Sequence, residues 1–214
     1  MKRIVILISG RGSNMEAILR AKLPVTVAAV ISNEPAAEGL RTSQIQNIPT
    51  AVIPHREFAE REDFDAALAM EINRHQPDFI VLAGFMRVLT EEFVVRYSGR
   101  MINIHPSLLP SFPGLHTHQR ALDAGVRIHG CTVHFVTPGL DSGPIIAQAA
   151  VPVLDGDTED QLAVRVLAEE HRIYPQVVRW LCEGHVRLDG EAVHYNGSTY
   201  HMQALLCPAL ESFS

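Results

Sequence analysis

The chain has 214 residues, of which 47% are hydrophobic and 20% charged, and its net charge is −6. This composition is typical of a folded α/β protein with a large core, and it excludes a disordered or fibrous chain. The acidic balance and the lack of a long lysine or arginine run argue against nucleic acid as a partner. The three cysteines, Cys131, Cys182 and Cys207, are far apart, which argues against a disulfide framework and favours a reducing, cytoplasmic compartment.

Short apolar runs alternate with amphipathic segments along most of the chain. Strands are expected at 3–8, 25–31, 50–53, 79–83, Met101–His105, 131–136 and 145–153, and helices at 15–21, 38–46, 57–75, 90–97, before Gly125 and after Thr158. The first run is too short to cross a membrane and has no signal-peptide cleavage site after it. The alternation predicts a mostly parallel sheet with right-handed crossovers in one domain.

The last predicted helix has clear sequence signals. Thr158 and Gln161 have the spacing of a capping box. Pro175 is expected to kink or segment the helix, because proline has no N–H to donate and clashes with the preceding turn. Glu170 falls on the apolar stripe of this helix, where a carboxylate costs free energy unless it is paired or faces a site.

The pattern weakens after residue 184. Two short apolar runs around Asp189-Gly190-Glu191 predict a small hairpin. We therefore expect one domain over residues 1–188 and a C-terminal tail over 189–214, which becomes loosely packed from Gly197.

The strand Met101–His105 carries two polar residues, Asn103 and His105, at alternate positions. Residues two apart on a strand point to the same side of a sheet, and Pro106 keeps His105 extended. Ligands bind at the carboxyl ends of strands in open α/β sheets. The pair therefore predicts a functional site, while a strand end that caps neighbouring backbone groups is an equally good interpretation of these two residues.

A glycine-rich turn, Gly10-x-Gly12-Ser13-Asn14, joins the first strand to the first helix. Its backbone N–H groups and the helix N-terminus favour an anion. Met15 stands where a dinucleotide fingerprint needs a third glycine, and the Lys-Ser/Thr pair of a Walker A loop is missing. A single phosphate monoester is the better prediction, and the alternative is a plain strand-to-helix turn.

Three other polar or unusual segments are ambiguous from the residues alone. The loop 84–89 is apolar enough either to hold a flat aromatic ligand or to pack into the core. His105, His116 and His118 lack the cysteines or helical spacing of a metal site, so no metal is expected. Asp141 lies in a turn and acquires a function only if His105 is close to it.

Four blocks together resemble the folate-dependent formyltransferases, and the Gly-x-Gly-Ser-Asn start narrows the resemblance to their phosphoribosylglycinamide branch. The blocks are residues 8–14, 81–87, 103–110, and 129–136 with 140–145. The resemblance covers about residues 3–184 and implies a Rossmann-like open sheet. It also implies 10-formyltetrahydrofolate as the formyl donor and glycinamide ribonucleotide as the acceptor, in purine synthesis.

Site residues follow from the resemblance. It implies Asn103, His105 and Asp141 as the catalytic trio. The residues implied to bind the ribonucleotide are Gly12, Ser13, Asn14 and Glu170, and those implied to bind the folate are Arg61, Met86, Arg87, Val88, Leu89 and Asn103. No metal and no permanently bound cofactor is expected, and the chain is expected to be a monomer or a homodimer.

Three alternatives are weighed against this function. A formyltetrahydrofolate hydrolase typically carries an extra N-terminal domain, whereas the first strand is expected at residue 3 here. A methionyl-tRNA formyltransferase needs a C-terminal nucleic-acid-binding domain, which thirty residues of an acidic chain are not expected to form. A non-catalytic nucleotide-binding module on the same fold is disfavoured by the intact set of Asn103, His105 and Asp141.

Overall fold

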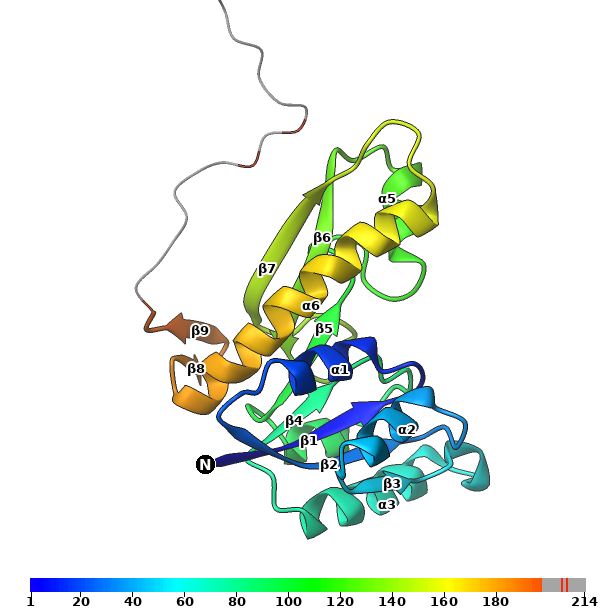
Figure 1. The fold of residues 1–214 in the computed structure, drawn as a ribbon, viewed down its shortest axis with the longest axis vertical. Helices are drawn as coiled ribbons and strands as arrows, with labels where there is room; N and C mark the ends of the chain where they lie inside the picture. The colour runs from blue at the N-terminus through cyan, green and yellow to red at the C-terminus, as the bar shows by residue number, and fades with distance from the viewer. Residues whose placement is uncertain (198–204, 206, 208–214) are drawn as a thin grey trace, which may run out of the picture.

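The computed structural model describes residues 1–197, 205 and 207. Seven strands form one sheet in the order β3-β2-β1-β4-β5-β6-β7 (Figure 1). The strands are β1 (Lys2–Ile8), β2 (Val25–Ser32), β3 (Thr50–Val52), β4 (Phe79–Leu82), β5 (Met101–His105), β6 (Ile128–Phe135) and β7 (Ile145–Pro152). The helices are α1 (Ser13–Arg20), α2 (Glu38–Ile45), α3 (Arg61–Arg74), α4 (Glu91–Arg96), α5 (Thr117–Asp123) and α6 (Glu159–Glu183).

The predicted, mostly parallel sheet is confirmed. Strands β3, β2, β1, β4 and β5 are parallel, whereas β6 is antiparallel to β5, and β7 to β6. Strand β6 begins three residues earlier than its apolar pattern predicts, because Gly130 lets it pair closely with β7. A Cβ atom at Gly130 would lie 2.0 Å from the carbonyl oxygen of Ala149. Strands β2 and β3 lie on one side of β1, and β4 and the later strands lie on the other side. The strand order therefore reverses between β1 and β4, and ligands are expected at the carboxyl ends of these two strands.

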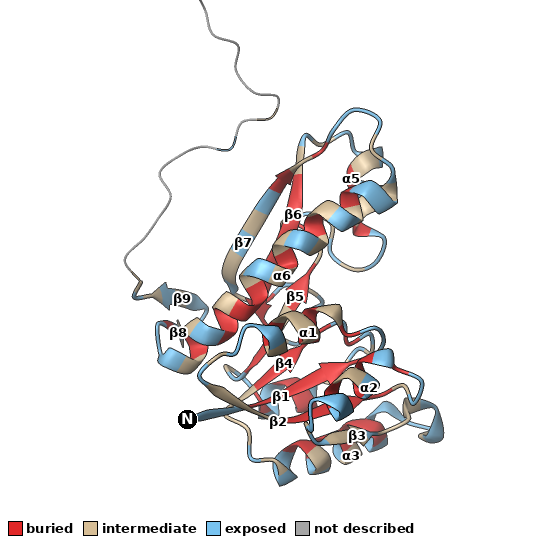
Figure 2. Cartoon of the chain, viewed as in Figure 1, coloured by how far each residue is buried: buried red, intermediate tan, exposed pale blue. Residues whose placement is uncertain are grey.

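Helices cover both faces of the sheet, and alternate residues of β1 point to opposite faces. Ile4, Ile6 and Ile8 pack against α1, α2 and α6, whereas Val5 and Leu7 pack against α3 and α4. Figure 2 shows the buried strands between these layers. The sheet is therefore held between two closely packed apolar layers, which fixes the strand ends that carry the site.

Helix α6 begins as predicted but does not break at Pro175. Gln161 N–H donates to Thr158 Oγ1 at 3.3 Å, and Thr158 N–H donates to Gln161 Oε1 at 2.9 Å, which confirms the capping box. Of the two expected effects of Pro175, segmentation is wrong, because α6 continues to Glu183, whereas a kink stays a prediction. Tyr174 and Val177 on either side of the proline are fully buried. Burying such side chains stabilises the helix by roughly 1.5–3 kcal/mol each, enough to offset the missing hydrogen bond.

The expected helix at 57–75 is also corrected. A short 3₁₀ turn, His55–Glu57, is followed by extended residues, and α3 begins only at Arg61. Phe58 is extended and its ring lies 5.8 Å from the ring of buried Phe64, edge to face. This contact turns the chain before the helix, which the helical spacing of the apolar residues did not reveal.

The predicted C-terminal hairpin is present as β8 (Val186–Asp189) and β9 (Ala192–Tyr195). It packs on α6, where the rings of Trp180 and Tyr195 have centroids 4.7 Å apart. The domain boundary at residue 188 stays a prediction, and the loose packing expected from Gly197 falls almost entirely outside the described residues. In the described part of the chain, no helix is long and apolar enough to cross a membrane.

Candidate active site

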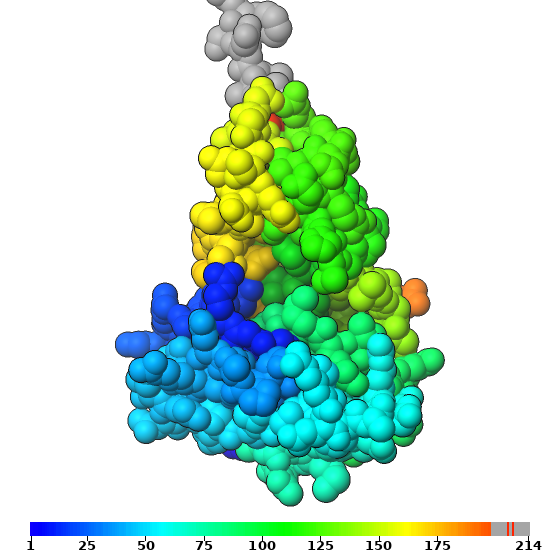
Figure 3. Space-filling model, turned by 90° about the vertical axis from the view of Figure 1, so that its right-hand side faces the viewer, coloured from blue at the N-terminus to red at the C-terminus, as the bar shows by residue number. Residues whose placement is uncertain are grey.

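The molecular surface has a hollow beside segments that carry several of the predicted site residues. Figure 3 shows it where the start of the chain, helix α6 and the green segments after β5 meet. Most of the predicted site residues lie at the carboxyl ends of β1, β4 and β5 or in the segments that follow these strands. This is the edge of the sheet at which the strand order reverses, as expected for a ligand site in an open α/β fold.

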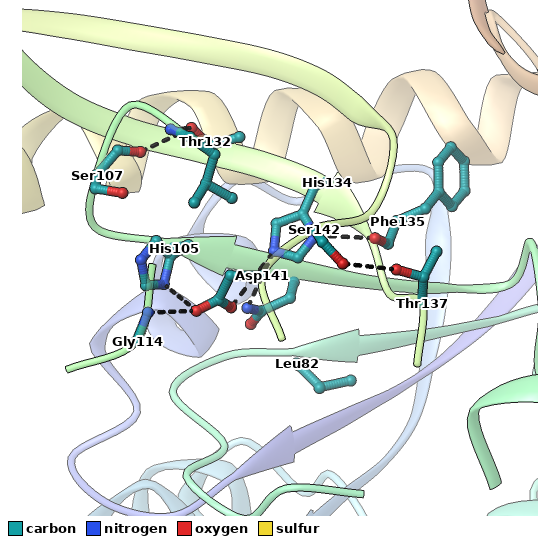
Figure 4. Close-up of polar contacts among 12 residues, drawn as sticks. Leu82, His105, Ser107, Gly114, Thr132, His134, Phe135, Thr137, Asp141 and Ser142 are labelled. Carbon is teal, nitrogen blue, oxygen red and sulfur yellow. Dashed lines mark hydrogen bonds and ion pairs between the residues drawn. The ribbon is translucent and has the colours of Figure 1, made fainter. Parts of the chain in front are cut away.

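His105 ends β5 and is 6% exposed. Its Nε2 lies 3.0 Å from the carbonyl oxygen of Phe112. Its Nδ1 lies 3.4 Å from Oδ2 of Asp141, as Figure 4 shows. Both neighbours are hydrogen-bond acceptors, so each nitrogen has a partner for a proton. This distance meets the condition for a functional Asp141, which is that His105 lies close to it.

Asp141 is held in place by the backbone. Its φ of 46° is in the left-handed region, which an aspartate tolerates better than most residues do. Its Oδ2 accepts the N–H of Gly114 at 2.8 Å. The turn also depends on Gly143, because a Cβ atom there would lie 1.8 Å from the carbonyl oxygen of Phe135. The carboxylate is thus aimed at His105 by a turn that few other sequences can adopt.

His134 joins this group, although the sequence analysis did not single it out. It lies opposite Asn103 in the register of β5 and β6, and its Nε2 is 3.4 Å from Asn103 Nδ2 and 4.0 Å from Asp141 Oδ1. Burial lowers the pKa of His134. A neutral ring that donates from Nδ1 to the carbonyl of Phe135, 2.8 Å away, can accept the Asn103 amide at Nε2. His134 therefore orients Asn103.

The loop after His105 is fixed by buried hydrogen bonds. Thr132 Oγ1 donates to the carbonyl of Ser107 at 2.7 Å and accepts the N–H of Leu109 at 3.0 Å. Gln148 donates to the carbonyl of Leu109 at 2.9 Å. These contacts hold the segment that leads to Phe112, whose carbonyl oxygen meets His105.

Gly12 caps α1 with a φ of 77°, and Ser13 and Asn14 form the first turn of that helix. A Cβ atom at Gly12 would lie 3.1 Å from the Cα of Gly39 and 3.2 Å from Cε of Met15. Both the backbone conformation and the space therefore favour glycine. The turn presents N–H groups at a helix N-terminus, which suits a phosphate.

Asn14 and Glu170 form a buried pair between α1 and α6. Asn14 Nδ2 donates to Glu170 Oε2 at 2.7 Å, and both residues are at most 9% exposed. Burial raises the pKa of Glu170, and the hydrogen bond from Asn14 opposes that shift. Asn14 Oδ1 has no hydrogen-bond partner in the described part of the chain. Glu170, which the sequence placed on an apolar stripe, is thus paired with Asn14 of the predicted phosphate turn.

The residues predicted to bind folate lie at a second part of the same edge. Arg61, Met86, Arg87 and Val88 line a cavity of about 700 Å³, whereas Leu89 packs against the core. The Arg87 guanidinium carbon lies 4.8 Å from the centre of the Phe64 ring. A hydrogen bond of 2.8 Å from the N–H of Met86 to Ser9 Oγ joins this loop to the end of β1.

Two further histidines, His118 and His129, lie near His105. His118 in α5 and His129 in β6 meet edge to face with ring centroids 5.4 Å apart, and His129 also meets the ring of Phe112. Burial lowers the pKa of His129 to about 4, and the neighbouring His118 contributes to the shift. Burial also lowers the pKa of His118. Both rings therefore pack as neutral groups under the loop that contacts His105.

This packing predicts a loss of stability in acid. An unfolded histidine has a pKa near 6.5, so between about pH 4 and 6.5 the unfolded chain binds more protons than the folded one. The contribution of His129 to the free energy of unfolding is fully present above about pH 6.5. It falls by on the order of 3 kcal/mol as the pH drops to about 4. Urea unfolding at about pH 7.5 and about pH 5 measures the loss. His129→Gln should reduce the difference between the two conditions, whereas exposed His194→Gln should not; equal differences in both variants would contradict the assignment.

Comparison with known proteins identifies the family of the chain. The family described as formyl transferase matches residues 2–178. The chain belongs to the formyl transferase family. Phosphoribosylglycinamide formyltransferase of Escherichia coli (strain K12) is 48% identical over 198 residues, which cover 91% of this formyl transferase and 93% of the relative.

Solved structures of formyl transferase relatives have the same fold. Phosphoribosylglycinamide formyltransferase of Coxiella burnetii, in complex with CHES, superposes with a TM-score of 0.89 at 49% identity, over 92% of this chain and 94% of that one. A formyltetrahydrofolate deformylase from Pseudomonas syringae pv. tomato superposes with a TM-score of 0.84 at 29% identity, over 91% of this chain and 65% of that one. The predicted fold and family are confirmed. In the described residues, no group of three His, Cys, Asp or Glu side chains is placed to hold a metal ion.

Proposed function

We propose that the chain transfers the formyl group of 10-formyltetrahydrofolate to the amine of 5′-phosphoribosylglycinamide, in de novo purine biosynthesis. The observation that carries the proposal is the constellation at the end of β5. An imidazole beside a carboxylate, 3.4 Å apart, stands on the same strand as an amide oriented by His134. This set combines a proton carrier with a hydrogen-bond donor, which acyl transfer requires.

The reaction uses these groups without a metal or redox cofactor. The acceptor amine attacks the formyl carbon, and the carbonyl oxygen acquires negative charge. The N–H of Asn103 and the Nε2–H of His105 would stabilise this charge, the latter after it exchanges the Phe112 carbonyl for the substrate oxygen. The bond between the formyl carbon and N10 of the folate then breaks. The amine loses one proton and N10 gains one, so one proton carried by His105 balances the step. Asp141 stabilises the protonated imidazole.

Different residues would bind the two substrates. Backbone N–H groups of Gly12, Ser13 and Asn14 would hold the ribonucleotide phosphate, and Glu170 would meet its ribose or glycinamide end. Arg61, Met86, Arg87, Val88 and Leu89 would border the folate, together with Asn103. Support comes from the cavity that four of these residues share and from the pairing of Asn14 with Glu170. The protein would act in the cytoplasm, as a monomer or homodimer.

One assay distinguishes this function from its alternatives. The chain is incubated with 10-formyltetrahydrofolate, with and without glycinamide ribonucleotide, and loss of the donor is followed. Turnover that depends on the ribonucleotide supports formyl transfer. Turnover without it would indicate a deformylase, the activity named for the Pseudomonas syringae relative, and no turnover would indicate a binding module.

The phosphate turn gives a prediction of its own. Gly12→Val should raise the KM for glycinamide ribonucleotide at least about tenfold, because a side chain at a φ of 77° is strained and meets Gly39. The KM for the folate should change little. Gly125→Val, at a positive φ after α5, is the matched control for strain alone. Equal increases in both KM values would place the phosphate elsewhere.

A further inference from the structure

A second groove lies between α1 and α6, apart from the cavity lined by the folate-binding residues. These two helices pack side by side at the front of the molecule (Figure 1). The groove has a volume of about 520 Å³, and its polar lining comes from Arg20, His171, Arg172, Gln176 and Arg179. None of these residues has a part in the proposed reaction, and no carboxylate is among the described residues that line the groove.

The three arginines have partners that leave most of their donors unused. Their carboxylates, Glu16, Glu169 and Glu183, sit on the same helices but do not line the groove. Each pair engages one guanidinium nitrogen: Nη2 of Arg20, Nη1 of Arg172 and Nε of Arg179. A guanidinium has five N–H donors. Ion pairs between exposed side chains contribute little stability, so a ligand with more than one negative charge can compete for them.

The spacing of the arginines suits an extended anion. Arg172 and Arg179 are seven residues apart on α6, which corresponds to about 10 Å along the helix axis. Arg20 faces them from the end of α1. A single phosphate group is too small to engage all three side chains without folding them together, whereas a chain of linked phosphates reaches from one to the next.

Neutral polar groups complete the groove. The Nε2 of His171 is buried without a hydrogen-bond partner in the described part of the chain. Gln176 adds an amide that can both donate and accept. The amide of Gln176 is therefore a neutral donor beside the cationic groups of the groove.

We propose that this groove binds an oligophosphate, such as the phosphate chain of a nucleoside triphosphate. The protein has a net charge of −6, yet three arginines and no carboxylate line this groove, and the glutamates paired with the arginines lie outside the lining. The groove is distinct from the phosphate turn at the other end of α1. Glu170 precedes His171 in the chain but pairs with Asn14, so the two sites face different sides of α6.

Calorimetric titration of tripolyphosphate into the full chain tests the proposal. Saturating glycinamide ribonucleotide is included so that the phosphate turn is occupied. One tripolyphosphate should bind per chain, and Arg172→Gln with Arg179→Gln should weaken it at least about tenfold. Inorganic phosphate should bind at least about tenfold more weakly than tripolyphosphate. Adenosine triphosphate, as a further arm, should bind at least as tightly as tripolyphosphate.

Arg74→Gln is the matched control, because Arg74 also pairs with a glutamate three residues away at 2.8 Å and is 70% exposed, on α3. This variant should keep the wild-type affinity. The double variant should keep the wild-type KM for glycinamide ribonucleotide, which shows that it is folded. Unchanged affinity in the double variant, an equal loss in Arg74→Gln, or no binding to the wild-type chain would overturn the proposal. Equal affinity for inorganic phosphate, or weaker binding of adenosine triphosphate, would overturn the assignment of the ligand.

Discussion

Replacing Asn103 by alanine is expected to lower kcat about 10²–10³-fold, the usual effect of losing one donor to a developing oxyanion. The amide is well placed for this role, because His134 accepts one of its N–H groups at 3.4 Å and leaves the other to donate. The substrates in their ground state gain less from this donor than the transition state does. Their KM values should therefore change much less than kcat. Steady-state kinetics with each substrate varied in turn measure both parameters.

A matched alanine substitution separates this effect from general damage. Asn73 accepts the hydroxyl of Tyr97 at 3.1 Å from α3, so Asn73→Ala also removes a hydrogen-bonded amide. It should leave kcat within about twofold of the wild-type value. If Asn103→Ala instead raises the KM values and leaves kcat unchanged, Asn103 positions a substrate and does not stabilise the oxyanion.

Much of the fold and the site was predictable because it depends on local patterns. Buried strands are recognisable as short apolar runs, and the alternation in Met101–His105 placed Asn103 and His105 on one side of the sheet. Glu170 was recognisable because an unpaired carboxylate is unfavourable on a buried helix face. In each case the position of a residue within its own strand or helix was enough to predict its surroundings.

Contacts between distant segments were not predictable from such patterns. His134 has the appearance of an ordinary residue in an apolar strand, and it gains a role only because register sets it opposite Asn103. The carbonyl of Phe112 meets His105 through a loop whose conformation depends on Thr132. Packing of Tyr174 and Val177 likewise outweighs the helix-breaking tendency of Pro175. The contact of His134 with Asn103 depends on the pairing of β5 with β6, and the continuity of α6 depends on the burial of Tyr174 and Val177.

Asp141→Asn is expected to lower kcat roughly 10²–10⁴-fold while leaving the fold almost intact. The amide oxygen of asparagine can still accept the N–H of Gly114, which Asp141 Oδ2 now accepts at 2.8 Å, so the turn should persist. The charge that faces His105 Nδ1 at 3.4 Å is lost. A protonated imidazole then loses its stabilising partner at the stage when the reaction needs it. Urea unfolding should change by less than about 1 kcal/mol.

A double-mutant cycle decides whether Asp141 acts through His105. If it does, Asp141→Asn should have little further effect in a chain that already carries His105→Gln, because residues that act as a unit are not additive. Asp123→Asn, which alters an exposed carboxylate bonded to Gln119 in α5, should leave kcat unchanged in both backgrounds. Independent, multiplying effects of the Asp141 and His105 substitutions would instead mean that the carboxylate contacts the substrate directly. In that case the 3.4 Å approach of the two side chains reflects the shape of the turn at Asp141, whose φ of 46° would aim its oxygen at the reacting atoms.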